Sequence, residues 1–184
     1  MMPMSDKTDV LTKEASQPLP SAKPISSGPG SYLVEVSLKP DFTDAEGISA
    51  QWLLHCAGLP ARAVRVGRLY DLRGPLNLGH VHVAVRELLC DSVTQEFRIC
   101  HSTGTAPHNG YLWRVEVWLK ATVTDTVGES VCAALRDLGM PDVSVRCGMS
   151  YHIAGKCGRN QLDKAVARSL ANPIVHHFSL HEAH

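Results

Sequence analysis

The chain has 184 residues, of which 44% are hydrophobic and 20% are charged, and its formal net charge is zero. These values are typical of a globular protein with one or two small domains. They give no bulk attraction to nucleic acid or to an anionic membrane, and no apolar run approaches the roughly 18 residues that a spanning helix needs. We therefore expect neither a nucleic-acid partner nor a membrane partner.

Residues 1–30 are rich in Ser, Pro, Lys and Thr and show no apolar periodicity, so we expect a disordered tail. A strand is predicted over residues 32–39, where apolar and polar side chains alternate. A helix should follow, with Asp44 as its N-cap and Gly58 just after its end.

The next stretch, residues 61–72, reads as a long strand, and the glycine at its middle, Gly67, is typical of a bulge or bend. Residues 78–90 carry apolar side chains at helical spacing and predict a second helix. A last strand should pass through Val93, Phe97 and Ile99. The first folded unit is thus residues 31–100, and the polar segment 101–110 is a linker.

Residues 111–180 repeat this order, and we expect residues 181–184 to form a short tail. The run Val34-Glu35-Val36-Ser37-Leu38-Lys39 returns as Val115-Glu116-Val117-Trp118-Leu119-Lys120, at an offset of 81 residues. The offset stays constant without gaps from the pair Val34/Val115 to the pair Phe97/Phe178, and Asp125 and Gly148 repeat Asp44 and Gly67. A long ungapped repeat of this kind indicates duplication of one small unit.

The predicted fold is therefore α+β, with two tandem β-α-β-α-β modules and the helices on one face of each sheet. A unit of about 70 residues is marginal alone, because its other sheet face stays uncovered. We expect the two modules to pack as a pseudo-twofold intramolecular dimer through their long middle strands or their open sheet faces.

The repeated motifs resemble the PurS family, the small subunit of phosphoribosylformylglycinamidine (FGAM) synthase. They are Leu38-Lys39-Pro40 with Asp44-Ala45-Glu46-Gly47, and Val64-Arg65-Val66-Gly67-Arg68 at a strand centre. The second copy has Val145-Arg146-Cys147-Gly148 and the finish Leu170-Ala171-Asn172-Pro173. Met149 departs from the pattern, because a lysine is usual there in the family.

The resemblance implies a non-catalytic structural subunit that bridges an ATP-dependent PurL-type synthetase and a PurQ-type glutaminase in purine biosynthesis. The complex is a carbon–nitrogen ligase. The resemblance also implies that the partner subunits use ATP, Mg and glutamine, and that this chain binds no cofactor or metal of its own. Self-association remains open.

The residues themselves favour the same absence of catalysis, because no phosphate-binding loop motif occurs. Asp44 and Asp125 are better explained as helix caps, and Glu35 and Glu116 as members of cross-strand ion pairs. The clustered histidines near the C-terminus fit no metal-binding motif.

Candidate subunit-interface residues are those that recur as cations, aromatics or strand glycines. They are Lys39, Trp52, Arg65, Gly67, Arg68, Tyr70, Trp118, Lys120, Arg146, Gly148 and Tyr151. The repeated cations could instead form salt bridges with Glu35 and Glu116, or remain solvated. The two tryptophans should lie outside the helix–sheet core, either between the repeats or against a partner.

Six cysteines occur without a C-x-x-C pair, which predicts free thiols in a reducing compartment, the cytoplasm. They are Cys56, Cys90, Cys100, Cys132, Cys147 and Cys157. The N-terminus has no basic segment followed by an apolar core, so we expect no secretory signal.

A second hypothesis comes from another functional class. Paired small α/β units also form regulatory modules that bind a small molecule at their junction, and the glycine-interrupted strands could supply backbone donors there. Binding to a metabolite would separate this hypothesis from the subunit hypothesis.

Overall fold

The computed structural model describes residues 30–100, 107–108 and 110–183. The predicted N-terminal tail and most of the predicted linker lie outside these residues. Within the described part, no helix is both long enough and apolar enough to cross a membrane.

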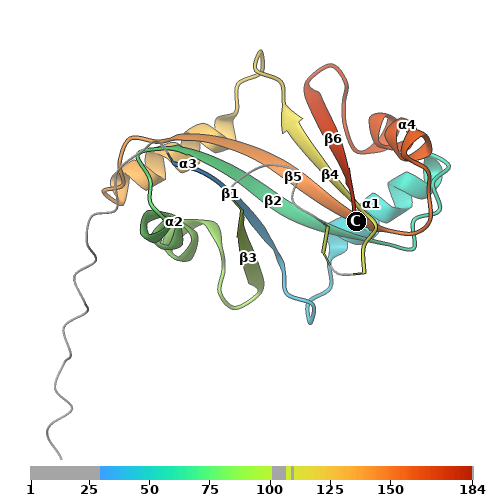
Figure 1. The fold of residues 1–184 in the computed structure, drawn as a ribbon, viewed down its shortest axis with the longest axis horizontal. Helices are drawn as coiled ribbons and strands as arrows, with labels where there is room; N and C mark the ends of the chain where they lie inside the picture. Colours follow the sequence, from blue (N-terminus) through green and yellow to red (C-terminus); the bar gives the residue numbers. More distant parts are fainter. Residues whose placement is uncertain (1–29, 101–106, 109, 184) are drawn as a thin grey trace, which may run out of the picture.

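A single six-stranded sheet organises the molecule (Figure 1). The strand order is β3-β1-β2-β5-β4-β6, and every neighbouring pair is antiparallel. The strands are β1 (Gly30–Leu38), β2 (Ala63–Gly74), β3 (Gln95–Cys100), β4 (Trp113–Leu119), β5 (Ser144–Ala154) and β6 (His176–Glu182).

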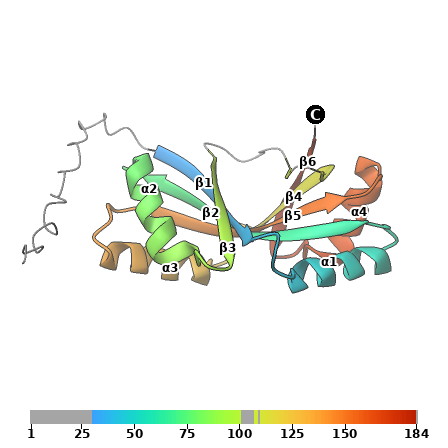
Figure 2. The same ribbon diagram turned by 90° about the horizontal axis from the view of Figure 1, so that it is seen from below.

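The helices all lie on one side of this sheet, in two groups (Figure 2). One group is α1 (Ala45–Cys56) with α4 (Arg159–Ser169), and the other is α2 (Leu78–Ala84) with α3 (Thr126–Asp137). A π-helical turn, Val85–Leu89, continues α2. The predicted α+β class is confirmed, and the two modules are compatible with the structure, although their strands form one sheet and not two.

The predicted helix caps are confirmed in both halves. Asp44 accepts a hydrogen bond from the Gly47 backbone N–H at 2.7 Å, and Asp125 accepts one from Gly128 at 2.8 Å. The second carboxylate oxygen of each aspartate accepts the backbone N–H of a long strand, from Val66 in β2 for Asp44. Each aspartate therefore starts a helix and also fastens it to the sheet.

The pairing register is the same in both halves. Ser37 pairs with Gly67, and their equivalents 81 residues later, Trp118 and Gly148, pair in the same way. Between the halves, β2 pairs with β5 so that Arg68 lies opposite Met149. These two residues are themselves repeat equivalents, so the pseudo-twofold axis passes between them.

The predicted bulge at the strand glycines is wrong. The β2–β5 ladder continues in register through Gly67 and Gly148. A Cβ at Gly67 would lie 2.6 Å from Ser150 Oγ, and a Cβ at Gly148 would lie 2.6 Å from the Trp118 ring. Glycine is required because a neighbouring side chain crosses the strand closely, not because the backbone bends.

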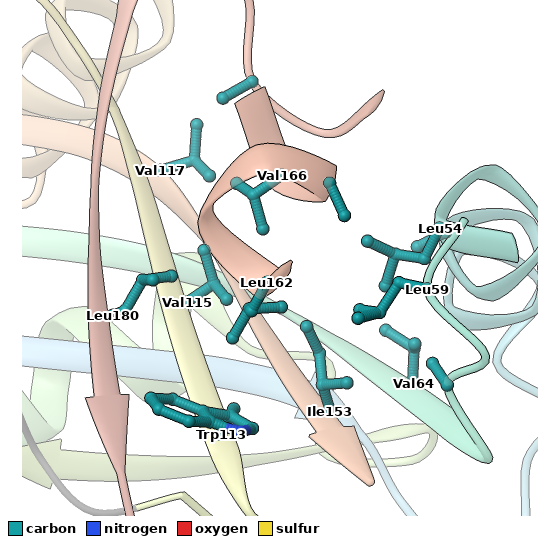
Figure 3. Close-up of a cluster of buried hydrophobic side chains, with 14 of the residues drawn as sticks. Leu54, Leu59, Val64, Trp113, Val115, Val117, Ile153, Leu162, Val166 and Leu180 are labelled. Carbon is teal, nitrogen blue, oxygen red and sulfur yellow. The ribbon is translucent and has the colours of Figure 1, made fainter. Parts of the chain in front are cut away.

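Two hydrophobic cores lie between the helices and the sheet, and each combines residues from both halves. In one core, Leu54 of α1 packs with Leu162 and Val166 of α4 over β2, β4 and β5 (Figure 3). In the other, Val81 of α2 packs with Leu135 of α3. Neither core would be complete in one half alone.

Two predicted strand ends differ from the structure. Val93 lies in a turn before β3, and β6 continues to Glu182, two residues past the predicted end of the repeat. The extra length is paired, because Glu182 lies opposite Trp113.

Candidate functional site

A buried polar network occupies the sheet face opposite the helices, where the two halves meet. Glu35 of β1 lies at its centre, and it is 2% exposed. Arg114 and Glu116 of β4 and Ser150 and His152 of β5 are all 0% exposed. Strand alternation explains the placement, since the neighbours Val34, Val115 and Ile153 point into the helix-side cores.

Each oxygen of the Glu35 carboxylate has two partners. Oε2 accepts from Arg98 at 2.6 Å and from Arg114 at 2.8 Å. Oε1 accepts from the Ser150 hydroxyl and contacts His152 Nε2 at 2.6 Å. Arg98 lies directly opposite Glu35 in the β1–β3 pairing, so the predicted cross-strand ion pair is confirmed for this residue.

Arg114 connects the two repeated glutamates. Its Nη1 donates to Glu35, and its Nε donates to Glu116 Oε1 at 3.0 Å. Glu116 also accepts from the Trp118 indole at 3.4 Å. A cation of the second half thereby neutralises acidic groups of both halves, and a buried charge needs such pairing.

The network shifts the pKa values of its members. Burial by itself raises the pKa of Glu35, but the hydrogen bond with His152, the charge of Arg114 and the Ser150 hydroxyl together hold it far below its ordinary value. Burial lowers the pKa of His152, partly offset by Glu35. Burial and the neighbouring His152 lower the pKa of His108 to about 4.

Hydrogen bonding defines which ring nitrogen of His152 carries the proton. Its Nδ1 accepts the backbone N–H of His108 at 3.1 Å, so the proton of the neutral ring lies on Nε2 and faces Glu35. The segment before β4 is thereby fastened over the network, where the two histidine rings meet edge to face with centroids 4.4 Å apart.

Glu35, His108 and His152 could together hold a metal ion, because their ligand atoms lie within 4.8 Å of one another. The surroundings favour a different role. Both Glu35 oxygens already accept two hydrogen bonds, and two guanidinium groups would repel a cation. We therefore interpret the cluster as a structural ion-pair network.

The repeated lysines, Lys39 and Lys120, stabilise the turns before β3 and β6 by hydrogen bonds to backbone carbonyls. Lys39 Nζ donates to the carbonyls of Ser92 and Val93 at 2.6 and 3.0 Å, and Lys120 Nζ donates to that of Pro173 at 2.5 Å. The alternative salt bridges to Glu35 and Glu116 are wrong for these lysines, because their ammonium groups are directed to the turns before β3 and β6.

The repeated arginines Arg65 and Arg146 also contact residues of their own half of the chain. Arg65 donates to the Leu38 carbonyl and pairs with Glu96 at 2.8 Å. Arg146 donates to the Leu119 carbonyl at 3.0 Å and lies over the Trp118 ring, 5.9 Å from its centroid. Neither forms the predicted alternative pair with Glu35 or Glu116; Arg98 and Arg114 do.

The two candidate tryptophans, Trp52 and Trp118, lie outside the helix–sheet cores, as predicted, but in different environments. Trp118 is 7% exposed and packs with Leu33 and Leu69 of the first half, so it lies between the repeats. Trp52 is 65% exposed on the outer face of α1, beside Ile48 at 58%. Burial between the repeats is therefore correct for Trp118 and wrong for Trp52.

The remaining candidates lie on the central strands. Gly67 and Gly148 face the polar network and Trp118. Arg68, Tyr70 and Tyr151 lie on the helix side near the pseudo-twofold axis, with Tyr151 packed against one core and Tyr70 against the other. The structure thus divides the predicted interface residues among turns, both sheet faces and α1.

Sequence reasoning missed Arg98, Arg114, Ser150, His108 and His152. A signal for Arg114 was present, because it occupies the position of the apolar Leu33 in the first repeat. Ser150 likewise replaces an apolar residue, Leu69, whereas Arg98 and His152 correspond to the polar residues Ser179 and Asp71 and do not stand out in this way.

Comparison with known families bears on the second half of the chain. Residues 112–183 match the family model described as PurS: Phosphoribosylformylglycinamidine (FGAM) synthase. This match supports PurS family membership. It covers one domain, so it does not itself identify a second PurS unit in residues 31–100.

None of the curated proteins matches this chain. The PurS match supports involvement in FGAM synthase and purine biosynthesis, and it implies protein partners.

Proposed function

We propose that the chain is a non-catalytic structural subunit of FGAM synthase that links the ATP-dependent synthetase to the glutaminase. The observation that carries this proposal is the PurS match over residues 112–183. The first half adds support, because it reproduces the strand pairing of the matched half at an offset of 81 residues. One chain would then supply what two PurS subunits supply elsewhere.

The chemistry of the described residues supports a structural role. The buried acid and base groups of the polar network pair with one another across the two halves. The five cysteines with described side chains are free thiols, which suits a reducing compartment such as the cytoplasm.

The outer face of α1 is the docking surface we assign to one of these partner subunits. Ile48 and Trp52 are separated by one helical turn and are both more than half exposed. Their equivalents on α3 are Glu129 and Ala133, so only the first half offers this apolar face. An exposed tryptophan beside an aliphatic side chain is typical of an interface anchor.

Reconstitution tests the proposal. The chain should co-purify with the synthetase and the glutaminase and should be required for glutamine-dependent FGAM formation. Trp52→Ala should weaken the complex by about 2 kcal/mol, a typical anchor effect, while Ile174→Ala, which truncates an even more exposed apolar side chain elsewhere, should not. Full glutamine-dependent activity without the chain would refute the proposal.

A further inference from the structure

A cavity of about 260 Å³ lies on the helix side of the sheet, next to the pseudo-twofold axis. The two groups of helices cover the ends of the sheet on this side (Figure 2), and the cavity lies beside the central β2–β5 pair. Its walls are mainly apolar and include Val117, Leu119, Val127 and Leu170. This size and composition suit a small organic molecule.

Arg68 places a positive charge at the edge of this cavity. Its Nη2 donates to Glu46 at 2.6 Å, away from the cavity, whereas its Nη1 faces the Met149 sulfur at 2.7 Å. A thioether is a weak acceptor, while an anion would form a charge-assisted hydrogen bond with the same N–H. Arg68 Nη1 could therefore form a stronger hydrogen bond with an anion in the cavity than it forms with the thioether.

The carboxylate that lines the cavity, Asp125, already accepts hydrogen bonds from the backbone. Asp125 accepts the N–H of Gly128 with Oδ1 and that of Cys147 with Oδ2, at 2.8 and 2.6 Å. Burial raises the pKa values of Tyr70 and Tyr151, so both lining phenols are neutral at pH 7 and can donate hydrogen bonds.

The first half has an equivalent cavity, which differs at the position of Val127. It has a similar volume, about 250 Å³, but Glu46 occupies the position of Val127 and binds Arg68. A carboxylate thus already occupies the Arg68 side of the first hollow. The second hollow has valine there and offers the same arginine to an external anion.

We propose that the cavity of the second half binds a small carboxylate with an apolar body, with the body against Val117, Leu119 and Val127 and the carboxylate on Arg68 Nη1. This site goes beyond the structural function and would provide the metabolite sensing that the sequence left open. The ligand would contact both halves of the molecule, because Arg68 belongs to the first half and the apolar wall belongs to the second.

Methionine-methyl NMR tests the site in the full chain, with octanoate as the probe. The Met149 methyl resonance should shift and saturate, whereas that of Met140, which packs in the core under α2 and α3, should not. Octan-1-ol has the same body without the charge, and it should bind about tenfold more weakly, because one charge-assisted hydrogen bond is lost.

Two variants locate the site. Val127→Glu introduces the first-half residue, and Arg68→Gln removes the charge; each should weaken octanoate binding at least about tenfold. Both side chains are half exposed or more, so folding should survive. Val93→Glu, which adds the same charge at a distant exposed turn, should bind like the parent.

The absence of a saturable Met149 shift would overturn the proposal. Equal affinity for octanoate and octan-1-ol would do the same, as would unchanged binding by Val127→Glu. These outcomes are independent of complex formation with the synthetase and glutaminase, so the structural function can stand if the site fails.

Discussion

At the scale of single residues, Arg114 links the two halves. It is 0% exposed, and it donates to Glu35 of the first half and to Glu116 of the second. Such a buried ion pair adds little net stability compared with apolar packing, but the loss of one member leaves buried charge unbalanced. Arg114 therefore determines which strands pair more than how tightly they pair.

Arg114→Leu, which installs the residue found at the equivalent position 33, should lower the free energy of unfolding by about 3–5 kcal/mol, because Glu35 and Glu116 both lose this cation. Urea denaturation would measure the loss. Arg136→Leu is the matched control. Arg136 lies 3.9 Å from Asp142 with both side chains well exposed, so its loss should cost less than about 0.5 kcal/mol. Similar effects of the two substitutions would contradict the role assigned to Arg114.

Acid should destabilise the fold in two stages. The folded pKa values of His152 and His108 lie below the ordinary 6.5, so the unfolded chain binds more protons once the pH falls below 6.5, and stability is lost. The depressed pKa of Glu35 adds a loss below its ordinary 4.5. Urea unfolding should show a drop of roughly 1–2 kcal/mol between pH 7 and 5.

His108→Asn should reduce this first drop, because one of the two imidazoles with a lowered pKa no longer titrates. A parent protein whose stability does not change between pH 7 and 5 would rule out the neutral histidine pair.

At the scale of elements, the sequence predicted most of what local rules control. Asp44 and Asp125 were identified as caps because a carboxylate three residues before a backbone donor can satisfy it, and that geometry needs no distant partner. The repeat also predicted the same order of elements in both halves, which the structure shows.

The sequence did not predict features that depend on how β2 meets β5. Glu35 reaches Arg114 across 79 residues and His152 across 117, so neither contact follows from local spacing. Gly67 was misinterpreted for the same reason. A Cβ at Gly67 would clash with Ser150, a residue of the other half, and only the strand register between the halves reveals this close approach.

At the scale of the whole molecule, the halves are joined twice, by the β2–β5 ladder and by two mixed cores. The ladder runs from Ala63 opposite Ala154 to Arg73 opposite Ser144. Leu54 of the first half and Leu162 of the second share one core (Figure 3). Separation would therefore expose an unpaired strand edge and half of each apolar surface.

Residues 31–100 expressed alone should consequently self-associate. The free edge of β2 would pair with a second copy, and the exposed core would require cover. Analytical ultracentrifugation should show concentration-dependent association, and added residues 111–184 should compete with it. A stable, concentration-independent monomer would show that each half folds without the other.

The Arg68–Met149 pair has a consequence for how such a protein can evolve. In an assembly of two identical chains, a residue on the symmetry axis always meets its own copy, so a charge there faces a like charge. Here one gene encodes both members separately, and a guanidinium lies against a thioether at 2.7 Å. Covalent linkage therefore gives natural selection access to unlike pairs at the centre of the sheet, where every mutation in a homodimer would occur twice.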